Sequence, residues 1–438
     1  MTEGSLTKKM VLFSLPLILS GILQQLYSWV DALIVGNTEG DLALAAIGSA
    51  VMVPNVISLL IIGFVSGMSI YAAQLFGQGD LERVWRMLRS TVIVSGAGML
   101  LLGVGLSLGS RQVLVLLNTA EDAFPQALAY LRIYLLGTGF VVIYNVYSAV
   151  LRGCGDSTAS LWCVLVSSCV NAALDVLFVV NLGWGVSGAA AATVISQFGA
   201  AAFVIFYAHR KYRIPLRQKA ADPADIRRAL RLSAPLAIQS SVKSVGNLIL
   251  QSFMNGFGSQ TVAAVTTAYR VDTVILLPVM NLGTGIATAV AQNAGTGKYR
   301  RAQEASRIGT RLMLVLSLVT VVAVLTGGRA VLSLFGLEPE TVDKGALFFR
   351  CMAVFYPVFG LSVACKNTLD GYGDTVFTSA VSIGALLIRI LVSYMIGDRI
   401  GVAVFAAAEA VSWAVMLCAF HLRSLLKARR RSLSIEAE

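Results

Sequence analysis

The stretch GQGDLER at residues 77–83 returns 218 positions later as GTGKYRR at residues 295–301. A second stretch, LRGCGDS at residues 151–157, returns at the same offset as LDGYGDT at residues 369–375. Near the starts, Ser14 and Pro16 match Ser233 and Pro235 at an offset of 219. Self-similarity at one fixed offset is the signature of an internal repeat. The sequence therefore predicts an N-lobe at 1–208, a linker at 209–231 and a C-lobe at 232–438.

The composition excludes a water-soluble globule. Hydrophobic residues make up 57% of the chain, charged residues only 13%, and a soluble domain carries about 25% charged residues. Stretches long enough to cross a bilayer, about 20 residues each, lie near 11–35, 48–76, 90–110, 133–151, 157–181, 185–208, 233–257, 264–294, 312–328, 347–366, 375–397 and 400–422. We expect an all-α integral membrane protein in which twelve transmembrane helices form two six-helix lobes. Because six is even, the repeats are parallel, and substrate should bind between them.

The basic residues are distributed asymmetrically between the loops of this predicted topology. Of 34 Lys and Arg residues, we assign 25 to one face of the membrane and four to the loops of the other. Basic loops stay in the cytoplasm, so we expect a multi-pass protein of the cell's inner (cytoplasmic) membrane with both termini cytoplasmic. The net charge of +11 then reflects topology, and no nucleic-acid partner is expected.

Several of these features resemble the multidrug and toxic compound extrusion (MATE) family. They are the early prolines of the first and seventh helices, the paired GxG loops and the paired RGxGD-like loops. The segments LYSWVDALIVGN (26–37) and VNAALDVLFVVNLGWGVSGAAAATVISQ (170–197) are also similar to signatures of that family. The resemblance implies a secondary antiporter that exports small amphiphilic drugs or metabolites, as in multidrug and xenobiotic efflux. It also links Pro16 to bending of the first helix, which makes this proline a hinge candidate.

Polar and acidic residues recur at helical spacing inside the N-lobe spans. Asp31 continues a polar stripe of the first helix, and Asn171 and Asp175 are four apart, so both lie on one helix face. Carboxylates, an amide and a hydroxyl that converge in a low-dielectric site can carry a proton or hold a Na⁺ ion. The resemblance implies the same coupling positions: Asp31, Asn171, Asp175 and Thr193. The alternative is a buried hydrogen-bond network that only joins helices.

The repeat offers a test of these alternatives. At the repeat offsets the four positions fall on Leu250, Arg389, Ser393 and Val411. None of the four side chains recurs in the second half. A network required by the fold should occur in both lobes, so its absence from one favours coupling chemistry in the N-lobe.

The C-lobe carries bases inside its predicted spans. Lys243 belongs to a stripe with Gln239, Asn247 and Gln251, and Arg389 lies in the eleventh helix. A basic lining would repel cations, which suggests an anionic or zwitterionic amphiphile as substrate. Alternatively, Glu409 and Asp272 neutralise these bases and the cavity is close to neutral. The candidate cavity residues are Gln24, Ser28, Tyr144, Asn145, Lys243, Asn247, Gln251, Arg389 and Glu409.

Other functional classes fit the sequence less well. A flippase for lipid-linked saccharides remains the alternative, since the basic C-lobe fits it in part. An enzyme is not expected, because the phosphate-binding pattern GxxxxGK[ST] is absent and the two histidines lie at predicted helix ends. We expect no cofactor besides the coupling H⁺ or Na⁺, and a monomer whose partners are a small-molecule substrate and the lipid bilayer. Asp156 and Asp374, which follow the paired glycine loops, should cap the next helices.

Overall fold

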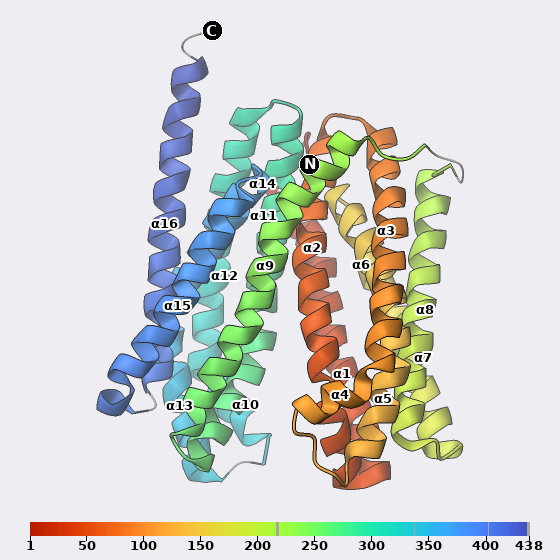
Figure 1. The fold of residues 1–438 in the computed structure, drawn as a ribbon. Helices are drawn as coiled ribbons and strands as arrows, with labels where there is room; N and C mark the ends of the chain where they lie inside the picture. Colours follow the sequence, from red (N-terminus) through yellow and green to blue (C-terminus); the bar gives the residue numbers. More distant parts are fainter. Residues whose placement is uncertain (216–218, 337, 402, 436–438) are drawn as a thin grey trace. The chain divides into compact units, whose positions relative to one another are not determined.

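The computed structural model describes residues 1–215, 219–336, 338–401 and 403–435, and every regular element in these ranges is a helix (Figure 1). They form two compact units. The N-unit comprises Leu15–Ser233, and the C-unit comprises Met1–Ser14 together with Ala234–Glu438. Two long helical segments, α1 (Leu6–Ala50, kinked at Gly40, whose backbone is not helical) and α9 (Pro223–Asn255), therefore each contribute residues to both units.

The remaining helices belong wholly to one unit. Those of the N-unit are α2 (Met52–Gly77), α3 (Leu81–Leu108), α4 (Ser110–Leu116), α5 (Phe124–Leu136), α6 (Thr138–Gly153), α7 (Thr158–Asp175), the π-helix η1 (Val176–Asn181) and α8 (Gly185–Tyr212). Those of the C-unit are α10 (Ser259–Ile275), α11 (Leu277–Gly295), α12 (Tyr299–Ser333), α13 (Pro339–Ala353), α14 (Tyr356–Gly371), α15 (Thr375–Ile400) and α16 (Ala403–Ile435).

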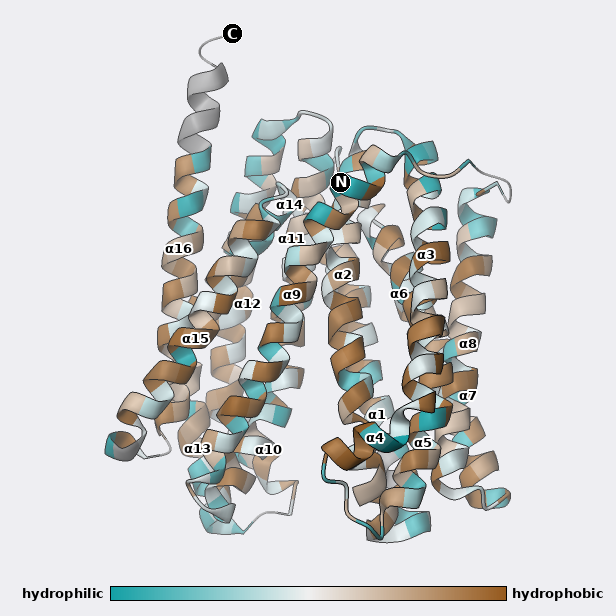
Figure 2. Cartoon of the chain, in the orientation of Figure 1, coloured by the Kyte–Doolittle hydropathy of each residue, from teal (hydrophilic) through white to brown (hydrophobic). Residues whose placement is uncertain are grey.

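The helices are long and apolar enough for a membrane protein. Among the described residues eight helices could each cross a bilayer, and the number rises to 11 if each of three bent helix pairs is one span. Each of the twelve predicted crossings falls on a helix or a bent pair, which confirms the fold class. The crossing predicted at 233–257 lies in α9, which is not among the eleven and carries a polar side chain at every fourth position from Gln239 to Gln251. Hydrophilic residues gather at helix ends and hydrophobic ones along their middles (Figure 2).

Proline accounts for two of the three bends between paired helices. The chain bends by 41° between α10 and α11 and by 53° between α13 and α14. Pro278 and Pro357 lie in the first turn of the helix that follows each bend. Proline fits the first turn, where no amide proton is needed, but disfavours helical backbone in the residue before it. The 46° bend between α5 and α6 lies at Gly137.

The sequence repeat reappears as a repeated helix contact. Gly153 of α6 faces α2, where an added Cβ would lie 2.5 Å from the carbonyl oxygen of Ser69. Gly371 of α14 faces α11 in the same way, and a Cβ added to it would lie 2.7 Å from the carbonyl oxygen of Ala287. Both the glycines and their partners are 218 positions apart. Only glycine lets the two backbones approach so closely, so each unit contains one copy of the same helix crossing.

In a further pair of contacts, the start of the first helix of each repeat packs against the other repeat. Gly67 of α2 packs directly on the backbone of Ser233 in α9, and Gly285 of α11 packs on the hydroxyl of Ser14 in α1. The first helix of each repeat thus begins on the second helix of the other repeat. The residues 1–14, predicted as part of the N-lobe, accordingly lie in the C-unit.

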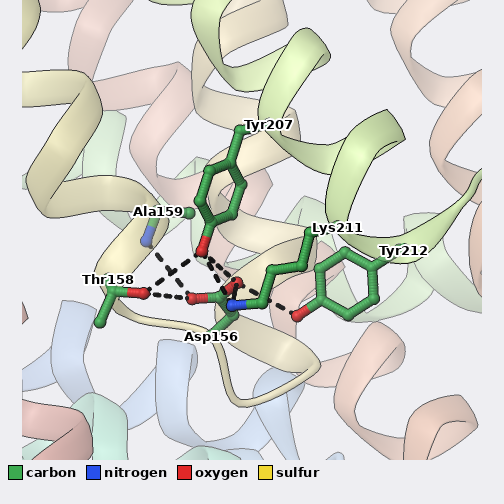
Figure 3. Close-up of polar contacts among 6 residues, drawn as sticks. All are labelled: Asp156, Thr158, Ala159, Tyr207, Lys211 and Tyr212. Atoms are coloured by element: carbon green, nitrogen blue, oxygen red, sulfur yellow. Dashed lines mark hydrogen bonds and ion pairs between the residues drawn. The ribbon is translucent and has the colours of Figure 1, made fainter.

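Asp156 fastens the loop between α6 and α7 to the end of α8 (Figure 3). Its carboxylate accepts hydrogen bonds from Lys211 Nζ (2.8 Å), Tyr207 Oη (3.0 Å), Tyr212 Oη (3.1 Å), Thr158 Oγ1 (2.8 Å) and Ala159 N (3.4 Å). Burial by itself would raise the pKa of Asp156, but the bonds from Lys211 and Thr158 outweigh it and leave the pKa lowered. We refer to these six residues as the loop clamp. The bond from Ala159 N agrees with the predicted cap of α7.

Asp374 forms the corresponding loop contact of the C-unit. It occupies the N-cap position of α15, yet its side chain makes no capping bond. Its Oδ2 instead accepts from Arg423 Nε (2.9 Å) and pairs with Lys427 Nζ (2.7 Å) on α16. The predicted cap is therefore wrong here, because two cationic donors compete successfully with a backbone amide.

Candidate ion and substrate sites

Three helices of the N-unit bring the four predicted coupling residues together. Asn171 and Asp175 lie one turn apart on α7, and both are fully buried. In the orientation that satisfies its amide, Asn171 Nδ2 donates to Asp175 Oδ2 (2.6 Å) and Oδ1 accepts from the Thr193 backbone nitrogen of α8 (3.2 Å). Asp31 of α1 lies within hydrogen-bonding reach of Asp175. We call Asp31 and Asp175 the carboxyl pair. Asn171 and Thr193 are its amide and hydroxyl neighbours.

The carboxyl pair has unmet hydrogen-bonding capacity. Within the described part of the chain, nothing donates to Oδ1 of Asp31 or to Oδ1 of Asp175. Two ionised carboxylates this close repel each other, and burying an unpartnered charge is costly. One proton shared between the two groups, or one cation bound between them, removes both costs.

Two tyrosines that were not predicted as site residues lie next to the carboxyl pair. The hydroxyl of Tyr27 lies near that of Thr193, which donates to the carbonyl oxygen of Ala189 (2.9 Å). The ring of Tyr130, on α5, is buried close to Asp31. Tyr27 lies four residues before Asp31, so helical spacing alone could have placed it on the same face.

The helix that carries Asn171 and Asp175 changes its geometry directly after them. α7 ends at Asp175 and continues as the π-helix η1, Val176–Asn181, closed by the bond from Leu182 N to Leu177 O (2.9 Å). π-Helical turns are rare and occur frequently at functional sites. The change from α-helical to π-helical hydrogen bonds therefore alters the backbone geometry directly next to Asp175.

The predicted cavity residues of the N-unit do not join this set. Gln24 and Ser28 are exposed, and the Ser28 hydroxyl donates to its own helix at Gln24 O (3.1 Å). Asn145 Nδ2 likewise donates to Val141 O (2.8 Å), and Tyr144 lies beside Ser148 and Arg152. Their contact with a substrate stays a prediction.

In the C-unit the predicted bases and acids form pairs. Arg389 of α15 pairs with Glu409 of α16 at 2.6 Å and also donates to Tyr269 Oη (3.0 Å). Asp272 is buried and accepts from Tyr356 Oη at 2.6 Å, so its partner lies on another helix. On α9, Lys243 and Asn247 are exposed, and Gln251 Nε2 donates to Asn255 Oδ1 (3.2 Å).

Pro16 lies inside α1, two residues after the point where this helix passes from one unit to the other. Pro235 holds the matching place in α9, after Ser233. Each proline removes one hydrogen bond of its helix. Their positions favour bending at these points, and the hinge role of Pro16 stays a prediction.

A family model described as MatE matches residues 16–177 and 235–395, once in each repeat. The chain belongs to the MatE family. Of its relatives, the "Probable multidrug resistance protein YpnP" of Bacillus subtilis is 30% identical over 386 residues, which cover 85% of this chain and 84% of that protein. The "FAD transporter" of Shewanella oneidensis is 24% identical over 386 residues, 85% of this chain and 84% of that one.

Solved structures share the fold of this MatE protein. An outward-facing multidrug resistance MATE family transporter has a TM-score of 0.87 and 21% identity, with 99% of this chain and 98% of that chain covered. The matched segments of the family model begin at Pro16 and Pro235, the two prolines at the crossing points between units. Asn171 and Asp175 lie near the end of the first matched segment, and Arg389 occupies the position of Asn171 in the second.

Proposed function

We propose that this MatE protein is a secondary antiporter that exports small amphiphilic compounds in exchange for inward H⁺ or Na⁺. The observation that carries the proposal is the carboxyl pair, in which Oδ1 of each residue is buried and has no donor among the described residues, so that a proton or a cation would satisfy both. The names of the relatives, which include a multidrug resistance protein and an FAD transporter, support export of small organic compounds.

The chemistry of exchange follows from the residues of the pair. A proton taken up between Asp31 and Asp175 neutralises one carboxylate and removes their mutual repulsion, so α1 can approach α7. Loss of that proton restores the repulsion and favours separation of the helices. A Na⁺ ion bound to the same oxygens would act in the same sense. The Thr193 hydroxyl would be a further oxygen ligand, and so would the Asn171 carbonyl once its amide is turned so that Oδ1 faces the pair. Binding that differs between two conformations couples ion movement to substrate movement.

The absence of this set from the second repeat supports a role in coupling. Arg389, Ser393 and Val411 stand at the repeat positions of Asn171, Asp175 and Thr193. The C-unit nevertheless forms the same helix crossing at Gly371 without them. The fold therefore does not depend on a carboxyl pair at this place.

The remaining parts of the proposal concern topology and assembly. The distribution of Lys and Arg supports cytoplasmic termini in the cell membrane. We further propose that the protein acts as a monomer, needs no cofactor beyond the coupling ion, and moves its two lobes relative to each other during transport.

Transport by purified protein in lipid vesicles tests this proposal. A fluorescent substrate is loaded, and a pH gradient or a Na⁺ gradient is imposed separately. We expect export to accelerate with one gradient and to stop when that gradient is collapsed by an ionophore. Export that ignores both gradients would contradict antiport. Scrambling of a labelled lipid-linked saccharide by the same vesicles, without export of the soluble dye, would support the flippase alternative.

A further inference from the structure

Lys243 stands on the inward face of α9. Leu236 and Leu250, seven residues before and after it and therefore on the same side of the helix, are both buried. Gly246, one turn further on, packs against the side chain of Leu386 in α15. Lys243 itself is exposed to solvent. Lys243 thus combines an inward position on a membrane helix with an accessible side chain.

The acids that could neutralise Lys243 already have partners. Glu409 pairs with Arg389 at 2.6 Å. The second base near Lys243 is Lys366, and its own acid is Asp370, at 2.6 Å. Among the described residues, Lys243 makes neither a hydrogen bond nor an ion pair.

The local charge balance is consequently positive. The charged groups that act on the Lys243 ammonium are Glu409, Arg389 and Lys366, and the single acid among them is nearest to Arg389. An unpaired positive charge on a membrane helix is unfavourable and marks a candidate binding position. A ligand that brings a negative charge would neutralise this charge.

Amide groups extend the polar surface on both sides of Lys243. Gln239 Oε1 is buried, and no described residue donates to it; Asn247 is exposed four residues further along. Amides can donate to and accept from a cargo along the helix. A single cation flanked by amides suits an organic anion better than an organic cation.

We infer that Lys243 determines substrate specificity and that the exported compound carries an acidic group, such as a carboxylate, sulfonate or phosphate, which binds the Lys243 ammonium. The inference rests on the proposed export function and adds the chemical class of the cargo. Arg389 contributes to the positive potential but is held by Glu409 and Tyr269, whereas Lys243 has no partner among the described residues and is free to contact the cargo.

Binding of two dyes with a common ring system tests this assignment. Fluorescein is anionic and rhodamine 6G is cationic, and fluorescence anisotropy gives the affinity of each for the purified protein in detergent. We expect the wild type to bind fluorescein more tightly. Lys243→Gln should weaken fluorescein binding about tenfold or more, as expected for loss of a charged hydrogen bond, and leave rhodamine 6G unchanged or tighter. Lys243→Arg should retain the anion preference, which controls for folding.

Arg270→Gln is the matched control, because it removes another exposed base of the same unit, from α10. Arg270 is not among the groups that act on Lys243, so this variant should keep both affinities. Tighter binding of rhodamine 6G to the wild type, no fluorescein binding, or an unchanged affinity ratio in Lys243→Gln would each overturn the inference. Because binding is measured without a gradient, these outcomes are independent of whether transport is ion-coupled.

Discussion

Oδ1 of Asp31 and Oδ1 of Asp175 are buried, and no described residue donates to either of them. Their helices, α1 and α7, are separate elements, so the state of one proton or cation influences how the two helices pack. Buried acids of this kind, placed next to an amide and hydroxyls, are typical of proton relays in transporters. At the residue scale, we therefore propose that binding of the coupling ion depends on these two side chains.

Replacement of either carboxyl by an amide tests this role. Asp31→Asn or Asp175→Asn removes the exchangeable proton or the ion's ligand but keeps the shape of the side chain. We expect gradient-driven export to fall at least a hundredfold while expression and the unfolding temperature stay close to those of the wild type. Transport in vesicles and thermal unfolding in detergent measure the two effects.

Asp272→Asn is the control for loss of a buried membrane carboxyl. Its amide oxygen can still accept from Tyr356, and it lies in the other unit. This variant should retain coupling. Full coupled transport in both Asp31→Asn and Asp175→Asn would exclude the carboxyl pair as the ion site.

Much of the residue-scale site could be predicted, because Asn171 and Asp175 have helical spacing and polar groups are conspicuous in apolar spans. Tyr27 and Tyr130 were missed, since aromatic residues in a membrane helix more often pack in a core. The geometry of the ion pair between Arg389 and Glu409 also could not be predicted. It depends on how α15 and α16 pack, which no local pattern specifies.

At the scale of elements, the loop clamp ties the start of α7 to the end of α8. Asp156→Asn removes the anion that Lys211 and the two tyrosines share, and should lower the free energy of unfolding by about 1–3 kcal/mol at pH 7. The pKa of Asp156 is lowered in the folded protein. Its contribution is therefore complete above the ordinary value of 3.8 and is lost as the pH falls through the lowered value.

Thermal unfolding followed by the fluorescence of Trp85, whose ring lies 5.2 Å from that of Tyr212, measures this contribution. The difference between wild type and Asp156→Asn should be constant from pH 7 to about 5 and should shrink in stronger acid. Asp122→Asn, at an exposed loop position, should cause no comparable change. A difference that grows as the pH falls would contradict the clamp.

The helix count could be predicted because hydropathy records which segments are apolar. The bends could not be placed, since a hydropathy window does not register the break between α5 and α6 at Gly137, and a proline predicts a kink without its angle. The exchanged starts of α1 and α9 were also missed. They depend on close packing of Gly67 on Ser233 and of Gly285 on Ser14, contacts between residues far apart in sequence.

At the scale of the whole molecule, the two copies of the repeat carry different charged side chains. The N-unit carries acids inside its helices; in the described part of the C-unit, Arg389 is paired with Glu409 and Lys243 has no partner. We propose that the acids move the ion and the free base selects the cargo. Duplication makes this division possible, because the helix crossings at Gly153 and Gly371 maintain each fold independently of the side chains in its site.

The flux of ions driven by a substrate gradient tests the account most directly. Vesicles that contain the protein receive a substrate gradient without any ion gradient, and internal pH and Na⁺ uptake are recorded together. The account predicts a flux of H⁺ or of Na⁺ opposite to the substrate, which is absent in Asp175→Asn. Substrate movement accompanied by neither ion, or an undiminished ion flux in that variant, would contradict it.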